Sequence, residues 1–402
     1  MFNPFKKRFF NLALGAGIGQ GCMLVTAAIL VATQNALAGE FTTAIGISSL
    51  LLLLIDWGGQ VSQRQFVAGS EENTNLTNFI FARLPPLFFS LVLILTVRHF
   101  TDEKFEFITT YLIWSSLGFA FSILNFSGYL DVKSKYAQHG LLSNINHIAM
   151  ALYALTCISY DVKLDPATSG AINSLGIITT SILVALMTKN AGNNGFYAPN
   201  FIPIKHLAAQ GFIITTGQLP GQIISRSISI VLLQNAGSTV AAQYNLLKSA
   251  AGIFTQIVTL ARRANYNDIY SNLTKTNDYY KFRPEAQIRS ILLGLLFAAT
   301  SFTALFLLKN SLEITSLSIS ALLVQNILWL WSSSYFFQMQ VYGKNNNQSL
   351  HALATCTAAI PFIYLANTKT VAQAILYESL FSFGIFIAFY LIYKQRYQQR
   401  KQ

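Results

Sequence analysis

The sequence predicts an all-α integral membrane protein with about twelve transmembrane helices in two six-helix bundles, related by a pseudo-twofold axis along the membrane normal. Of its 402 residues, 53% are hydrophobic and only 10% are charged, whereas a soluble domain carries about 25% charged residues. The apolar residues gather into runs near the roughly twenty residues that cross a bilayer. The Lys and Arg residues flank these runs, mainly on alternate connectors.

The apolar runs set the order of the expected spans. They lie near residues 10–34, 42–62, 78–97, 107–127, 140–160, 169–188, 209–235, 239–261, 286–308, 314–337, 350–367 and 370–393. The first run could instead belong to a cleavable signal peptide, because it follows Lys6-Lys7-Arg8 and precedes Ala36-Leu37-Ala38. It is longer than the about 7–15 apolar residues of a signal segment, so we favour an uncleaved first span.

The distribution of basic residues orients the chain. With the N-terminus in the cytoplasm, most of the 27 Lys and Arg residues fall on the inner side of the membrane. The outer connectors hold Arg98, Lys104, Lys163, Lys309 and Lys369. This bias predicts that both the N-terminus and the C-terminus are cytoplasmic.

An inner connector that contains Asn193-Asn194-Gly195 predicts the boundary between the two halves. The halves also show a weak internal echo, in which Gly17 and Gly21 align with Gly217 and Gly221. An even number of spans in each half makes such a repeat parallel. The expected units are an N-terminal bundle (1–190), a cytoplasmic linker (191–208) and a C-terminal bundle (209–402), which together enclose a central cavity.

Several classes of function lack their sequence signatures. The net charge of +12 lies beside membrane spans, so we expect no nucleic-acid partner. Cys22, Cys157 and Cys356 are far apart within apolar runs, which gives neither a metal spacing nor a disulfide framework. The chain has no phosphate-binding loop of the form G-x-x-x-x-G-K-S/T, no catalytic triad and no paired carboxylates. We therefore expect no cofactor, no metal and no catalytic centre.

Three basic residues lie inside apolar runs: Arg83, Arg226 and Lys248. A cation at the centre of a span costs roughly 2.5–3.5 kcal/mol, so it should face the protein interior or water. Gln218 and Gln222 share a helical face with Arg226, and Asn245 precedes Lys248 in the eighth span. We predict that these six residues bind a polar, anionic substrate. The alternatives are that the polar faces only join helices and that the Arg83 side chain extends to the cytoplasmic interface.

Embedded acids are scarce, and they are candidates for coupling transport to an ion gradient. Glu378 lies in the last span and Asp56 near the inner end of the second, while His147 in the fifth span could relay protons. The alternative for both acids is a structural pair with an embedded cation. The alternative for His147 is a hydrogen-bonded packing role.

Prolines inside the spans are candidate hinges, because proline breaks the helical hydrogen-bond pattern. They are Pro85 and Pro86 in the third span and Pro220, which lies between Gly217 and Gly221, in the seventh. The alternative is a static bend that only improves packing.

The stretch LLLLIDWGGQVSQRQFVA (51–68) resembles a segment of the polysaccharide-exporting branch of the multidrug/oligosaccharidyl-lipid/polysaccharide (MOP) exporter superfamily. In that branch, which includes the O-antigen and capsule flippases, an apolar run ends in an acid or amide, then glycine, then a later arginine. Asp56, Gly58 and Arg64 occupy those places. Residues 225–253, with Tyr244, resemble the start of the family's second half. The first hairpin departs from the pattern, because Thr42-Thr43-Ala44 replaces Gly-x-Tyr.

The resemblance implies a MATE-like fold and a flippase for an undecaprenyl-diphosphate-linked oligosaccharide in the bacterial inner membrane. Membrane lipids, a polysaccharide polymerase and a chain-length regulator would be its partners. The embedded cations suit a diphosphate, and Gln and Asn side chains suit sugar hydroxyls. Three alternatives are a MATE-like drug or cation antiporter, which should line its cavity with acids; a polysaccharide polymerase or glycosyltransferase, which usually needs a larger outer loop; and a passive scaffold or channel.

Overall fold

The computed structural model describes residues 4–33, 36–69, 75–100, 105–132, 142, 144–190, 195–264, 316, 319–329 and 359–399, and most of these residues are helical. The helices are α1 (Pro4–Ala32), α2 (Ala38–Asp56), α3 (Gly59–Gly69), α4 (Leu76–Phe100), α5 (Glu106–Phe121), the short 3-10 turn η2 (Ser122–Leu124), α6 (Ser127–Val132), α8 (Ile145–Ser159), α9 (Pro166–Asn190), α10 (Phe201–Asn235), α11 (Ser238–Ala264) and α16 (Val371–Gln399). Two further helical segments are Ile319–Trp329 and 359–365. The expected span near 286–308 lies outside the described residues, and those near 314–337 and 350–367 are described only in part.

The expected all-α membrane architecture is confirmed. In the described part of the chain, extended pairing is limited to an isolated bridge between Asn75 and Gly195. Among the described residues, four helical stretches are long and apolar enough to cross a membrane: Ala38–Gln65, Leu76–Phe100, Glu106–Leu124 and Pro166–Asn190. Phe88, Phe89 and Leu95 on α4 expose more than half of their surface, as expected of a helix that faces lipid.

The second expected span is two helices rather than one. α2 ends at Asp56, and Trp57 (φ 50°) and Gly58 (φ 65°) then take left-handed conformations. The Trp57 N–H donates to the Leu54 carbonyl (3.2 Å), which closes the last turn before α3 begins. The glycine at position 58 allows this break, because glycine adopts positive φ without a steric cost.

α10 begins at Phe201, inside the segment predicted to be the linker. The Asn200 side chain accepts a hydrogen bond from the Ile202 N–H (3.2 Å), which caps the first turn. Pro203 follows within that turn, where its missing N–H costs no helical hydrogen bond. The cap therefore moves the start of the seventh helix toward the N-terminus.

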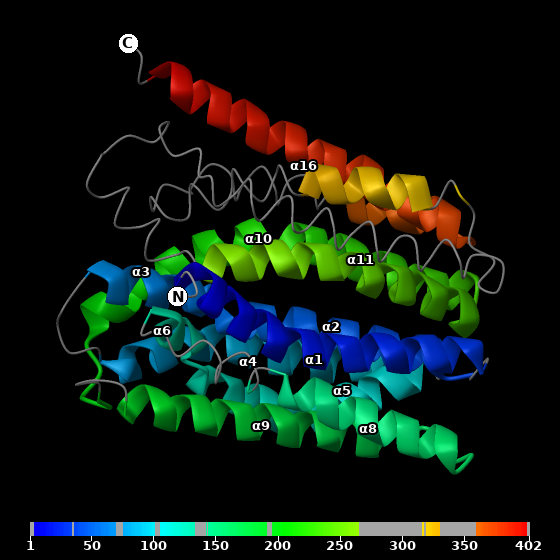
Figure 1. The fold of residues 1–402 in the computed structure, drawn as a ribbon, viewed down its shortest axis with the longest axis horizontal. Helices are drawn as coiled ribbons and strands as arrows, with labels where there is room; N and C mark the ends of the chain where they lie inside the picture. The colour runs from blue at the N-terminus through cyan, green and yellow to red at the C-terminus, as the bar shows by residue number, and fades with distance from the viewer. Residues whose placement is uncertain are drawn as a thin grey trace.

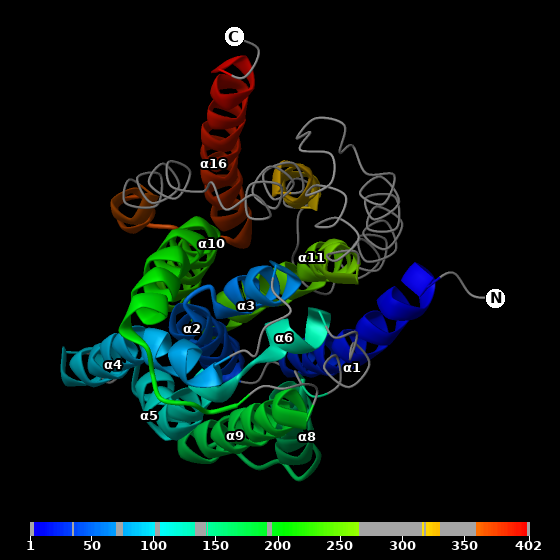
Figure 2. The same cartoon turned by 90° about the vertical axis from the view of Figure 1, so that its left-hand side faces the viewer.

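α10 and α11 lie between the helices of the N-terminal half and α16 (Figures 1 and 2). α1 and α2 contact α11, and α2 and α4 contact α10. One apolar core spans both halves, with Leu30 and Phe41 from the N-terminal half and Ile228 and Leu247 from the C-terminal half fully buried in it. In the described residues, the interface between the halves is therefore formed mainly by α1, α2 and α4 on one side and α10 and α11 on the other.

The turn between α10 and α11 gives a test of this hairpin. Gly237 has φ 89° and a Cβ there would meet no atom within 4 Å, so Gly237→Ala should destabilise the protein through backbone strain alone, by about 1 kcal/mol. The same change at Gly252, which lies inside α11 and also has open space around it, should stabilise the helix by about 1 kcal/mol. Thermal unfolding of the purified proteins in detergent measures both, and equal shifts would contradict the assigned turn.

Candidate substrate cavity between the two halves

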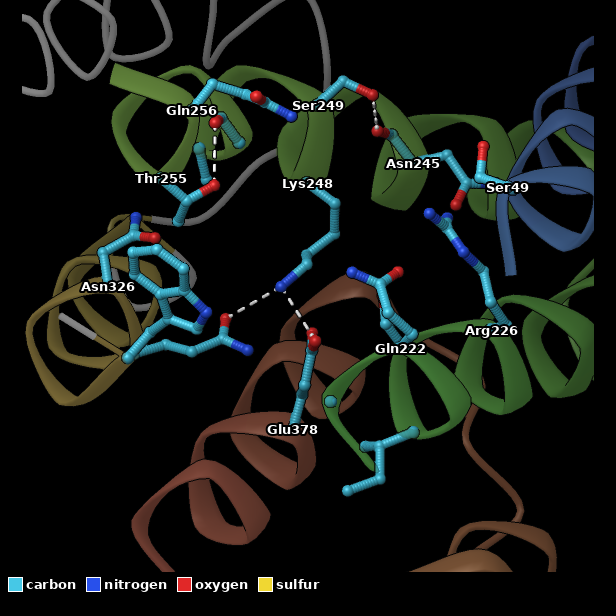
Figure 3. Close-up of a pocket in the computed structure, with 18 of the residues that line it drawn as sticks. Ser49, Gln222, Arg226, Asn245, Lys248, Ser249, Thr255, Gln256, Asn326 and Glu378 are labelled. Atoms are coloured by element: carbon cyan, nitrogen blue, oxygen red, sulfur yellow. Dashed lines mark hydrogen bonds and ion pairs between the residues drawn. The ribbon is translucent and has the colours of Figure 1, made fainter. Parts of the chain in front are cut away.

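A cavity of about 540 Å³ lies between the two halves. Its described walls come from α1, α2 and α8 of the N-terminal half, and from α10, α11, Ile319–Trp329 and α16 of the C-terminal half. Figure 3 shows part of this lining, in which polar and charged side chains of α10, α11 and α16 converge. Because both halves contribute, a relative movement of the halves would change the shape of the cavity.

The structure brings most of the predicted site residues to this cavity. They are Gln218, Gln222 and Arg226 from α10, Asn245 and Lys248 from α11, Glu378 from α16 and His147 from α8. The three α10 residues face the same way because their spacing matches the helical repeat. Arg83 and Asp56 do not appear in the described lining.

Lys248 and Glu378 form an ion pair across the cavity wall. Lys248 Nζ lies 2.8 Å from Glu378 Oε1 and donates to Gln325 Oε1 at 3.3 Å. The Tyr244 hydroxyl donates to Glu378 Oε2 at 2.8 Å, so both carboxylate oxygens have partners. Glu378 is 4% exposed, and a carboxylate buried to this degree is tolerated only with such partners. This is the structural pairing that the sequence left as the alternative for Glu378.

Arg226 has no such partner. Its Nε atom is buried without a hydrogen-bond partner, and the described residues give it no ion pair. The guanidinium lies against Gly46 of α2, where a Cβ would come within 2.5 Å of Arg226 Nη1. Gly46 therefore makes room for the guanidinium. A buried donor left unsatisfied costs about 1–3 kcal/mol, and more when it is charged, so an anion that reached this group would relieve that cost.

Asn245 joins three helices at one end of the cavity. Its Nδ2 donates to Thr43 Oγ1 (3.2 Å) and to Ser229 Oγ (2.9 Å). Thr43 and Ser229 also hydrogen-bond each other at 2.9 Å. Asn245 is 5% exposed, and its amide is engaged by α2 and α10. Asn245, which was predicted to bind substrate, thus also links the two halves.

Three lining residues are less constrained than Asn245: Gln218, Gln222 and His147. Gln222 is exposed to the cavity, whereas Gln218 and His147 are half-buried. None of the three side chains hydrogen-bonds to another side chain or to the backbone within the described part of the chain. The hydrogen-bonded packing role considered for His147 therefore has no partner in these residues.

Arg83 and Asp56 form a separate buried clamp outside the cavity. Arg83 Nη2 lies 2.5 Å from Asp56 Oδ1, and Nη1 donates to the carbonyls of Ile123 (2.9 Å) and Asn125 (2.8 Å). Arg83 is 1% exposed, so it neither reaches the interface nor lines the cavity. Gly59 leaves the space that the guanidinium occupies. The geometry is that of a structural tie between α2, α4 and the end of α5.

The candidate hinge residues lie within continuous helices. α4 runs through Pro85 and Pro86, and α10 runs through Pro220, without interruption. Gly221 lines the cavity, and a Cβ there would meet no atom within 4 Å. A role as hinges stays a prediction for all of these residues, including Gly217.

Sequence reasoning missed four residues that complete the site. Gln325 and Ser382 extend the Lys248 pair through a 3.4 Å hydrogen bond, and Gln325-Asn326 stands out as a polar pair inside an apolar run. That pair was a usable signal. Gly46 was not, because its role depends on the packing of α2 against α10.

The Arg83 clamp can be tested by stability. Arg83→Ala leaves the Asp56 carboxylate and two carbonyls without their partner, so we expect a loss of about 3–5 kcal/mol in unfolding free energy. Lys189→Ala, at an exposed position in the last turn of α9, is the matched control and should change stability by less than about 0.5 kcal/mol. Unfolding of both purified variants in detergent gives the comparison, and similar values would argue against the clamp.

No protein-family model and no curated protein matches the sequence, but the fold is close to those of solved transporters. The inward-facing conformation of a multidrug resistance MATE family transporter of the MOP superfamily aligns with a TM-score of 0.64 at 14% identity, over 95% of each chain. An outward-facing conformation aligns with a TM-score of 0.57 at 15% identity, over 99% of this chain and 97% of the other.

A third similar structure is a MOP superfamily transporter from Pyrococcus furiosus, in which a reverse polarity of the binding pocket suggests a different function. It aligns with a TM-score of 0.58 at 14% identity, over 99% of this chain and 97% of the other. The chain therefore has the fold of the MATE transporters of the MOP superfamily, which is that of a multi-pass membrane protein.

Proposed function

We propose that the protein is a flippase that moves an undecaprenyl-diphosphate-linked oligosaccharide from the cytoplasmic to the periplasmic leaflet of a bacterial inner membrane. Both termini would lie in the cytoplasm, and the cavity would open alternately to each side. The observation that carries the proposal is Arg226, which lines the cavity between the two halves and whose Nε has no hydrogen-bond partner in the described part of the chain.

The charge of the cavity favours an anionic ligand. Its described lining contains the cations Arg226 and Lys248 and the carboxylate of Glu378. Lys248 and Glu378 compensate each other, so the charge of Arg226 is left over. A guanidinium binds phosphate oxygens in bidentate fashion, and such charge-assisted hydrogen bonds are about twice as strong as neutral ones.

The neutral part of the lining suits a sugar. Gln218, Gln222 and Gln256 present carboxamides to the cavity, and Ser49 and Thr255 present hydroxyls. These groups can hydrogen-bond sugar hydroxyls. A volume of about 540 Å³ lies within the usual range of ligand sites, about 300–1,000 Å³. The headgroup would occupy the cavity while the lipid tail stayed in the bilayer.

The fold supports transport in general, because the similar solved structures are transporters captured in inward-facing and outward-facing conformations. The Pyrococcus furiosus protein adds that pocket polarity can differ among proteins of this fold. We therefore take the polarity of this cavity, more than the fold, as the guide to its substrate.

A drug or cation antiporter is the second candidate, because Glu378 is an acid in the cavity wall. Its carboxylate is neutralised by Lys248 and also bound by Tyr244, which leaves it poorly placed to attract a cation. Export of a lipophilic dye such as ethidium by the purified protein in vesicles would favour this candidate.

The flippase proposal predicts that Arg226→Gln abolishes surface polysaccharide in a complementation assay while the protein remains in the membrane. The change keeps a polar side chain but removes the charge that would bind the diphosphate. We expect glycan display to fall at least about tenfold, as is usual when a charge-assisted hydrogen bond is lost. Normal display would contradict the proposal, and Lys189→Ala serves as the control.

Lys248 needs a double variant, because Lys248→Ala also leaves Glu378 buried without its partner. Lys248→Met combined with Glu378→Gln removes both charges and keeps the volume, so stability should be largely restored. Recovery of display in the double variant would show that Lys248 acts only on structure. Low display in the double variant, with normal display in Glu378→Gln alone, would support substrate binding by Lys248.

Coupling to an ion gradient is a further expectation, with Glu378, Asp56 and His147 as its candidates. Glu378 and His147 line the cavity, whereas Asp56 pairs with Arg83 outside it. We expect collapse of the proton gradient by an ionophore to reduce transport of lipid-linked glycan in vesicles severalfold. Transport that continued unchanged without proton and sodium gradients would rule out such coupling.

A further inference from the structure

The segment Ile319–Trp329 places a second unsatisfied donor in the cavity wall. Asn326 is 8% exposed, and its Nδ2 atom is buried without a hydrogen-bond partner in the described residues. Its carboxamide extends toward Thr255 and Gln256 of α11 (Figure 3). Since nearly all buried polar groups in proteins are paired, a donor in a cavity wall without a partner among the described residues is a candidate position for a ligand acceptor.

The neighbours of Asn326 are neutral. Trp329 lies one helical turn further along the same segment and also lines the cavity. Gln256 is exposed to the cavity without a side-chain hydrogen bond, and the Thr255 hydroxyl donates to the Gly252 carbonyl (2.8 Å), so its oxygen can still accept. An aromatic ring beside amides and a hydroxyl offers both an apolar surface and hydrogen-bonding groups, which a sugar ring requires.

This neutral group and Arg226 lie at opposite ends of the view in Figure 3, with Lys248 between them. The described lining thus has Arg226 beside α2 at one end and the uncharged group around Asn326 at the other, with the Lys248–Glu378 ion pair between them. A ligand that fills both ends carries an anionic group and an uncharged, oxygen-rich group on one molecule. This arrangement also distinguishes a glycosylated diphosphate from a bare one.

We propose that Asn326, Trp329, Thr255 and Gln256 form a sugar subsite for an uncharged monosaccharide unit of the substrate. Asn326 Nδ2 donates to an oxygen acceptor of the sugar, and Trp329 packs against the face of the ring. The subsite rests on the proposed function, because Arg226 holds the diphosphate end. A site with an orphan donor discriminates strongly against ligands that lack the acceptor, since the donor then stays unpaired.

The test uses the full-length protein in nanodiscs and two probes: undecaprenyl diphosphate, and undecaprenyl diphosphate that carries one N-acetylglucosamine. The wild type should bind the glycosylated probe more tightly. Asn326→Leu should weaken binding of the glycosylated probe by about tenfold and leave binding of the bare diphosphate unchanged. Arg226→Gln should weaken both. Ile327→Ala, at a position that is 47% exposed and outside the described lining, is the matched control.

Stability separates a ligand role from a structural one. Because Asn326 Nδ2 has no protein partner, Asn326→Leu should leave the melting temperature of the unliganded protein unchanged or raised. Equal binding of the glycosylated probe by Asn326→Leu and the wild type would overturn the subsite, as would an equal loss for both probes. If Arg226→Gln bound both probes as tightly as the wild type while Asn326→Leu weakened only the glycosylated probe, the assignment of the diphosphate to Arg226 would be wrong instead. Binding of neither probe by the wild type would overturn both proposals.

Discussion

Lys248, which is half-buried, and Glu378, which is buried, form an ion pair in the cavity wall, and this pair influences the charge that the cavity offers to a ligand. Each ion loses several kcal/mol of hydration when it is buried, and only good geometry with further hydrogen bonds repays that loss. Tyr244 and Gln325 supply those bonds. The described lining therefore holds two cations, Arg226 and Lys248, against the one carboxylate of Glu378. That leaves one positive charge in excess among these residues.

Arg83 and Arg226 show how the same residue type can have different roles. Arg83 is bound by the Asp56 carboxylate and by backbone carbonyls, so its hydrogen-bonding capacity is used by the protein. Arg226 lies in a cavity wall with a buried, unpaired Nε. Because its donors are already bound within the protein, Arg83 has a structural role. The unsatisfied donor makes Arg226 the group that gains most from an anionic ligand.

Sequence periodicity was sufficient to predict which residues lie together when all of them belong to one helix. Gln218, Gln222 and Arg226 share a face because of helical geometry, and the structure places all three in one cavity. Arg83 could not be assigned in this way, because its partners include Asp56 and Asn125, which are distant in sequence and meet it only after α2, α4 and the end of α5 have packed. Burial in an apolar run indicates that a cation needs a partner, and the sequence alone does not say whether protein or ligand provides it.

Asn326 also shows that the sequence alone does not reveal whether an embedded polar side chain is bound by the protein. A polar residue in an apolar run is visible in the sequence, yet its neighbour Gln325 is hydrogen-bonded within the wall whereas Asn326 Nδ2 is not. Adjacent residues on a helix face directions about 100° apart, so one of the pair can serve the fold while the other serves a ligand. Only the packing of Ile319–Trp329 against α11 and α16 distinguishes them.

Close backbone contact between the halves explains why Arg226 points where it does. Gly39 packs against Ser238, Gly46 against Arg226 and Gly58 against Ile214, and small residues of this kind let membrane helices approach each other closely. At Gly46 the space that a side chain would fill holds the guanidinium itself. A larger residue there would push Arg226 away from α2. The position of the Arg226 guanidinium, and with it the anion binding that we propose, therefore depends on a glycine that carries no charge.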